Sequence, residues 1–67
     1  MQTYNAVLLP YYRILDVDIT ANFDDIKKKY RELARLYHPD LNKSRHATEL
    51  MQSINEAYRK IAAHFGG

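Results

Sequence analysis

Apolar side chains recur at helical spacing in two long stretches of this chain. In the first stretch they fall within a sector about 60° wide on a helical wheel. The residues on that face are Ile26, Tyr30, Leu33 and Tyr37. Asn22 is a favourable N-cap residue, and two aspartates follow in the first turn, where they complement the helix dipole. The pattern predicts a helix over Phe23–Tyr37.

The second stretch follows Ser44, a plausible N-cap residue, and runs to about His64, before two glycines end the pattern. Its apolar face holds Ala47, Leu50, Met51, Ile54, Ala57, Tyr58 and Ile61, and Phe65 extends it. A connection of about seven residues between two helices of similar length predicts an antiparallel hairpin. The two apolar faces then form the core.

The N-terminal part is less regular. Residues 1–9 show no periodicity and are expected to be a loose leader. Pro10 suits the first position of a short helix over Tyr11–Leu15, and Asp16 would end it in a left-handed conformation. We therefore expect an all-α fold: an antiparallel helical hairpin with a short N-terminal helix packed across it.

Composition narrows the class of protein. A chain of 67 residues forms one domain and buries about 60% of its unfolded surface, too little for a deep catalytic cavity. There is no Cys, so disulfides and thiolate metal sites are excluded. The net charge of +2 does not by itself demand a nucleic-acid or membrane partner. No apolar run approaches the roughly 20 residues of a membrane span.

The tripeptide His38-Pro39-Asp40 separates the two long helices. Proline disfavours a helical conformation in the residue before it, so the first helix should end at Tyr37 and a tight loop should follow. That loop would expose an imidazole and a carboxylate on a stiffened backbone. Together with His46 they match no established zinc spacing, and no nucleophile or third group completes a catalytic site. We expect a binding surface, without metal, cofactor or catalytic residues.

Basic residues gather on one flank of the first long helix. They are Lys27, Lys28, Arg31 and Arg35, about 100–200° around the wheel from Ile26. Such a flank can simply be solvated, or it can meet an acidic protein surface, where charge steers encounter. A helix–turn–helix that binds DNA is less well supported, because its turn has 3–4 residues. Tyr30 lies at the edge of the core face and fits either core packing or an interface anchor.

Four segments, taken together, resemble the J domain of DnaJ-type co-chaperones. Tyr11–Val17 is similar to its opening, Ile26–Ala34 to its second helix, Tyr37–Asn42 to its signature loop and Ile54–Tyr58 to its third helix. The match covers about residues 10–62 in the right order and spacing. We therefore expect a leader over 1–9 and a J domain over 10–65. The family's short fourth helix is expected to be absent or truncated at the end of the chain.

The resemblance implies a co-chaperone module that docks on an ATP-dependent chaperone of the 70-kDa heat-shock class (DnaK type) and stimulates its ATP hydrolysis, supporting protein folding. Carried over by position, the residues that bind the partner are His38, Pro39, Asp40, Lys27, Tyr30, Arg31 and Asn42. The domain would perform no chemistry of its own, and client polypeptides would be bound by other domains. A cytoplasmic monomer is expected, with no nucleic-acid or membrane partner.

The sequence also departs from the family pattern at four positions. Asp16 stands where Gly is common, Lys29 where a small residue is usual, Glu32 at an often basic position, and Leu41 where a basic residue frequently follows the triplet. These differences bear on affinity and partner choice. Two alternative functions therefore stay open. The domain could be a J-fold adaptor that binds another protein without stimulating it, or, as a third hypothesis, a small DNA-binding helical domain.

Overall fold

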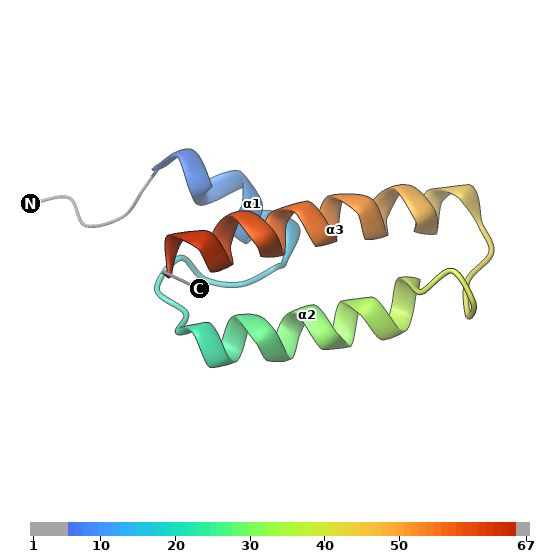
Figure 1. The fold of residues 1–67 in the computed structure, drawn as a ribbon, viewed down its shortest axis with the longest axis horizontal. Coiled ribbons are helices and arrows are strands. Elements are labelled where there is room, and N and C mark those ends of the chain that lie inside the picture. Colours follow the sequence, from blue (N-terminus) through green and yellow to red (C-terminus); the bar gives the residue numbers. More distant parts are fainter. Residues whose placement is uncertain (1–5, 66–67) are drawn as a thin grey trace, which may run out of the picture.

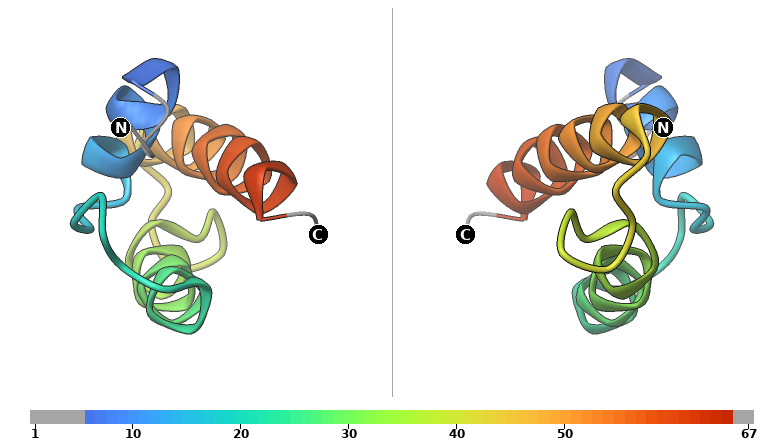
Figure 2. Two further views of the ribbon diagram at one scale, coloured as in Figure 1. Left: turned by 90° about the vertical axis from the view of Figure 1, so that its left-hand side faces the viewer. Right: turned by 90° about the vertical axis from the view of Figure 1, so that its right-hand side faces the viewer.

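The computed structural model describes residues 6–65 of the chain. A 3₁₀ turn, η1 (Ala6–Leu8), leads into a short helix, α1 (Leu9–Ile14), and two long helices follow, α2 (Phe23–Tyr37) and α3 (Arg45–His64). The two long helices run in opposite directions, and α1 crosses α3 (Figure 1). Seen from its ends, the molecule places α1 and α2 against different sides of α3 (Figure 2). The predicted all-α hairpin is confirmed.

The ends of α2 and α3 are those predicted, because local capping fixes them. The Asn22 side chain accepts the Asp25 N–H at 2.8 Å at the start of α2. Ser44 Oγ accepts the Ala47 N–H at 3.0 Å at the start of α3. Each cap satisfies a donor that the helix itself leaves unpaired.

The start of the fold differs from the prediction. Helix α1 begins at Leu9, two residues before the predicted Tyr11, because the preceding 3₁₀ turn runs straight into it. Leu8 is buried in the core, so the last part of the segment expected to be a leader packs on the domain. Residues 1–5 of that segment lie outside the described residues. Asp16, predicted to be left-handed, has a φ of 58°.

The core lies where the three helices meet. Leu15, Ile26 and Ile61 are its largest fully buried side chains. The other residues of this core cluster are Leu8, Tyr12, Ile54 and Ala57, and Ala47 is buried as well. Ile14 is 39% exposed although its neighbour Leu15 is fully buried, because consecutive residues of one turn cannot all face the hairpin.

Aromatic rings form a second contact between the long helices. Tyr58 of α3 stacks on Tyr30 at 4.3 Å between ring centroids and on Phe23 at 6.0 Å, both from α2. Phe23 also contacts Phe65, just beyond the end of α3, at 5.3 Å. These four rings, the aromatic column, hold α2 against α3 along one side of the hairpin.

Candidate functional site

The turn after α2 is built on one backbone carbonyl. His38 is the C-cap of α2 and has an extended conformation (φ −63°, ψ 134°), as the following Pro39 requires. Its carbonyl oxygen accepts the N–H of Leu41 at 2.9 Å and the N–H of Asn42 at 2.8 Å. The chain therefore reverses direction within a few residues at the end of the hairpin.

The imidazole of His38 is oriented by the same turn. Its Nδ1 accepts the backbone N–H of Asp40 at 3.2 Å, so in the neutral ring the proton is on Nε2. The Asp40 carboxylate lies 3.8 Å from Nδ1, close enough to pair with a protonated ring. The side chains of His38 and Asp40 are 53% and 84% exposed. A donor N–H and a carboxylate are thus presented together to solvent.

Asn42 links the turn to α3. Its side-chain oxygen accepts the backbone N–H of Ser44 at 3.2 Å, and Ser44 is the N-cap of α3. Asn42 is half-buried, whereas Pro39 is exposed. The side-chain oxygen of Asn42 therefore already accepts a hydrogen bond within the domain. The predicted contact between Asn42 and a partner stays a prediction.

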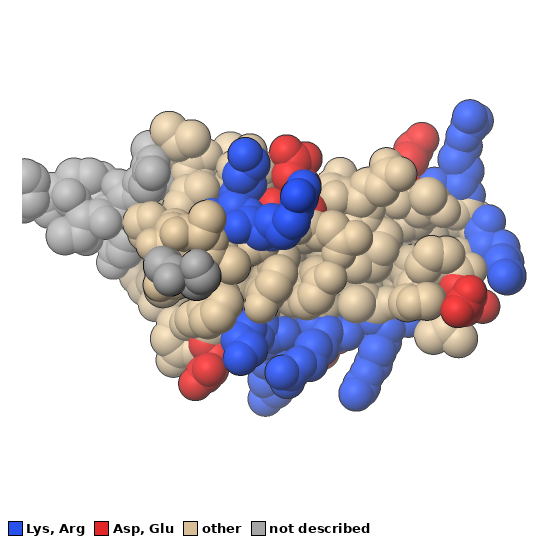
Figure 3. Space-filling model, in the orientation of Figure 1, with Lys and Arg blue, Asp and Glu red and all other residues tan. Residues whose placement is uncertain are grey.

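The basic face of α2 consists of Lys27, Lys28, Arg31 and Arg35. Lys and Arg atoms line the lower edge of the molecule over α2 (Figure 3). Lys28, Arg31 and Arg35 are exposed, and Lys27 is half-buried with its Nζ 5.7 Å from the centre of the Phe23 ring. The structure thus places the predicted contacts Lys27 and Arg31 on the helix that ends at the His-Pro-Asp turn.

Three of the four departures from the family pattern form one charged cluster. Lys29 Nζ lies 3.7 Å from the Asp16 carboxylate and 3.9 Å from that of Glu32. On the helical wheel Glu32 lies about 40° from Lys28, at the border of the basic face, and Lys29 lies about 100° from Lys28. Exposed pairs of this kind contribute little to stability, but here each unusual charge has an opposite charge beside it.

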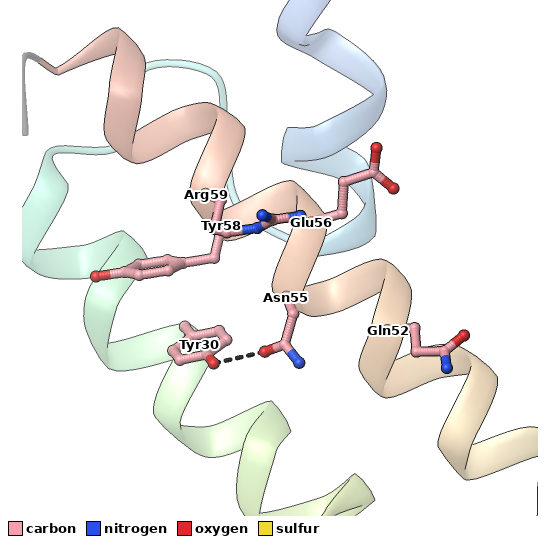
Figure 4. Close-up of a pocket in the computed structure, with 6 residues that line it drawn as sticks. All are labelled: Tyr30, Gln52, Asn55, Glu56, Tyr58 and Arg59. Atoms are coloured by element: carbon pink, nitrogen blue, oxygen red, sulfur yellow. Dashed lines mark hydrogen bonds between the residues drawn. The ribbon is translucent and has the colours of Figure 1, made fainter.

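Tyr30 is fixed to α3 at both ends of its side chain. Its hydroxyl donates a hydrogen bond to Asn55 Oδ1 at 2.6 Å, and its ring stacks on Tyr58 (Figure 4). It borders an open hollow of about 550 Å³ between α2 and α3, lined by Tyr30, Gln52, Asn55, Glu56, Tyr58 and Arg59. Tyr30 is half-buried, so it packs between the helices while part of its surface stays accessible. Its role as a docking contact stays a prediction.

Sequence reasoning missed Asn55. The sequence offers one signal for this residue: Asn55 follows Ile54 and lies at the border of the apolar face of α3. That border position does not reveal a partner 25 residues away. Only the packed hairpin brings the amide to the Tyr30 hydroxyl.

The described residues contain no group of three or more His, Cys, Asp or Glu that could hold a metal ion. Within the same residues, no helix has the length and apolar character needed to cross a membrane. The surface around the turn offers hydrogen-bond donors, a carboxylate and a row of cations. Such groups suit the recognition of another macromolecule.

Comparison with known proteins agrees with this geometry. The DnaJ domain family profile matches residues 10–63. The chain is 50% identical over 52 residues to the Chaperone protein DnaJ of Oceanobacillus iheyensis, covering 78% of this chain and 14% of that protein. It is 47% identical over 57 residues to that of a Roseiflexus species, covering 85% and 15%. For the Gloeothece citriformis protein the identity is 56% over 52 residues, covering 78% and 14%.

No solved structure matches the chain in the same comparison. The chain spans about one seventh of the length of the curated relatives it matches. The matched region runs from the second residue of α1 to the last residue but one of α3, and it includes all of α2 and the His-Pro-Asp turn. On the match over residues 10–63, with the helical hairpin and the turn between its helices, the chain belongs to the DnaJ domain family.

Proposed function

We propose that this domain is a co-chaperone module that binds a DnaK-type chaperone of the 70-kDa heat-shock class and stimulates its ATP hydrolysis. The observation that carries the proposal is the exposed imidazole–carboxylate pair of His38 and Asp40 at the end of the helix that bears the basic face. Membership of the DnaJ domain family supports it, since the relatives are chaperone proteins by name.

The groups at the turn suit a charged partner surface. The Asp40 carboxylate can accept a bidentate, charge-assisted hydrogen bond from an arginine of the partner. The His38 ring offers its Nε2–H, because Nδ1 already accepts the Asp40 N–H. Pro39 restricts the backbone and so reduces the entropy lost when the turn is held.

The basic face would act at longer range. Lys27 and Arg31, with their neighbours on α2, attract an acidic surface and set the register of docking. The domain itself performs no chemistry. It acts by binding one conformation of the chaperone more tightly than another, which shifts the chaperone toward the state that hydrolyses ATP. Client binding would belong to other parts of a full-length co-chaperone, and the cytoplasmic location and monomeric state stay predictions.

The test is single-turnover ATP hydrolysis by a panel of purified DnaK-type chaperones with and without the domain. We expect the intact domain to accelerate hydrolysis and His38→Gln to reduce the acceleration about 5- to 150-fold, because loss of the Nε2–H donor leaves its buried acceptor on the partner unsatisfied, at a cost of about 1–3 kcal/mol. His64→Gln is the matched control, since His64 is also exposed but lies at the far end of α3. The control variant should stimulate like the intact domain.

Circular dichroism must show that both variants keep their helices. Stimulation by a folded His38→Gln variant would contradict the proposal. Binding of the intact domain without any stimulation would favour the adaptor function instead. The observation that favours this second function is exposed Leu41, because a basic residue frequently follows the triplet in the family.

A further inference from the structure

The side chain that follows the His-Pro-Asp triplet is unusually exposed for its type. Leu41 is 75% exposed, at least as much as any other large apolar side chain of the described residues. It lies in the turn and not on a frayed end, because its N–H is bonded to the His38 carbonyl at 2.9 Å. Its backbone is therefore fixed while its side chain is left in water. A folded domain gains nothing for its own stability from that arrangement.

Leu41 directly follows Asp40, whose carboxylate is 84% exposed. When a partner covers that carboxylate, an apolar neighbour at the rim excludes water and strengthens the charged contact. The surface at this corner is thus mixed: one carboxylate, one imidazole donor, and an apolar side chain beside them. A partner that fits it needs a cation next to an apolar patch.

The domain contains a second exposed leucine that allows a direct comparison. Leu36 is 62% exposed, but on the helical wheel it lies about 80° from Lys28 and about 140° from Arg31, outside the basic face. It therefore has the same chemistry and similar exposure at a position outside the proposed docking surface.

From these observations we infer that Leu41 is a specificity-determining contact: it docks into an apolar patch of the DnaK-type partner that borders the cation paired with Asp40. The inference rests on the proposed function and adds the chemistry of the partner's surface at this corner. It also follows that partners with an acidic group at that place are poor matches, because an acidic group would be desolvated against leucine without a counter-charge.

The experiment uses the panel member that the intact domain stimulates most. Binding to its ATP-bound form and the half-stimulating concentration are measured for the intact domain and for Leu41→Ala, Leu41→Arg and Leu36→Arg. Truncation to Ala removes most of a buried leucine side chain, so we expect Kd to rise about 10-fold. Leu41→Arg should weaken binding further, since it places a cation beside the partner's own cation, and the loss should shrink between about 50 and about 200 mM salt. Leu36→Arg carries the same charge change and should stay within about twofold of the intact domain.

The maximal rate of stimulated hydrolysis should be retained by Leu41→Ala at saturating concentration, because the His38–Asp40 pair is intact. Equal Kd values for the intact domain and Leu41→Ala would overturn the inference, as would tighter binding of Leu41→Arg, which would indicate an acidic patch. An equal loss in Leu36→Arg would also overturn it, because the effect would then be one of general charge. An intact domain that stimulates no panel member would refute the proposed function itself, and the two failures are therefore distinct.

Discussion

Removing the Tyr30 hydroxyl isolates one hydrogen bond between α2 and α3. Tyr30→Phe keeps the ring that stacks on Tyr58 at 4.3 Å and deletes only the donor to Asn55 Oδ1 at 2.6 Å. A neutral hydrogen bond contributes about 0.5–1.5 kcal/mol net. Asn55 is exposed, so water can replace the lost donor. We expect the free energy of unfolding to fall by about 0.5–1 kcal/mol, toward the lower end of that range.

Thermal and urea unfolding followed by far-ultraviolet circular dichroism measure this change. In a domain of this size a loss of 1 kcal/mol lowers Tm by about 4–8 °C, so the expected decrease is about 2–8 °C. Tyr37→Phe is the matched control, because Tyr37 is also half-buried on α2 but its hydroxyl has no partner among residues 6–65. Its Tm should change little.

A double-mutant cycle with Tyr30→Phe and Asn55→Ala separates the bond from other effects of each substitution. If the bond holds the helices together, the two changes are not additive, and the coupling free energy is about 0.5–1 kcal/mol. Additivity within about 0.3 kcal/mol would refute the reasoning. So would an equal loss of stability in the Tyr37→Phe control.

Three further predictions concern local structure. Asp16→Val should lower the free energy of unfolding by about 1–2 kcal/mol in urea titrations, because the backbone at this position is left-handed (φ 58°) and a β-branched side chain disfavours that conformation. The control Asp16→Gly loses the same carboxylate but should not lower the free energy of unfolding. Equal losses in the two variants would rule out a backbone cause. Ser44→Ala should cost about 1 kcal/mol in thermal unfolding, since its Oγ caps the Ala47 N–H; an unchanged Tm would contradict this. Hydrogen bonds from the Thr20 hydroxyl and N–H lower the pKa of Asp18 below its usual 3.8. Because the folded pKa is the lower one, the stabilisation is present above pH 3.8 and is lost as the pH falls through the folded pKa. Thr20→Ala should therefore flatten the decline in stability below that pH, and an unchanged slope in acid urea titrations would count against it.

Much of the fold follows from local patterns. The bounds of α2 and α3 were predictable because apolar periodicity and a capping residue coincide at Asn22 and at Ser44. The left-handed Asp16 was predictable from its place after a short helix. The start of α1 was not, because Leu8 is buried by tertiary contacts with no periodic signal before Pro10.

The candidate site also has features that could be predicted from the sequence and features that depend on the folded structure. The exposed turn at Pro39 could be expected from the sequence, since proline limits the residue before it. The orientation of the His38 ring could not, because it depends on a hydrogen bond to the Asp40 N–H that only the folded turn provides. The destination of the Tyr30 hydroxyl depends on the packing of two helices, and a helical wheel contains no information about the second helix.

The aromatic column gives the protein a built-in optical probe. The chain has six tyrosines and no tryptophan, and Tyr58 touches rings that belong to the opposite long helix. If α2 and α3 separate while each stays helical, the near-ultraviolet circular dichroism of these rings should vanish and the far-ultraviolet signal should persist. Separation of the two helices can thus be distinguished from unfolding of the helices without attaching a label. Because this chain has no tryptophan, the fluorescence of a tryptophan-containing chaperone can be excited separately in the same sample.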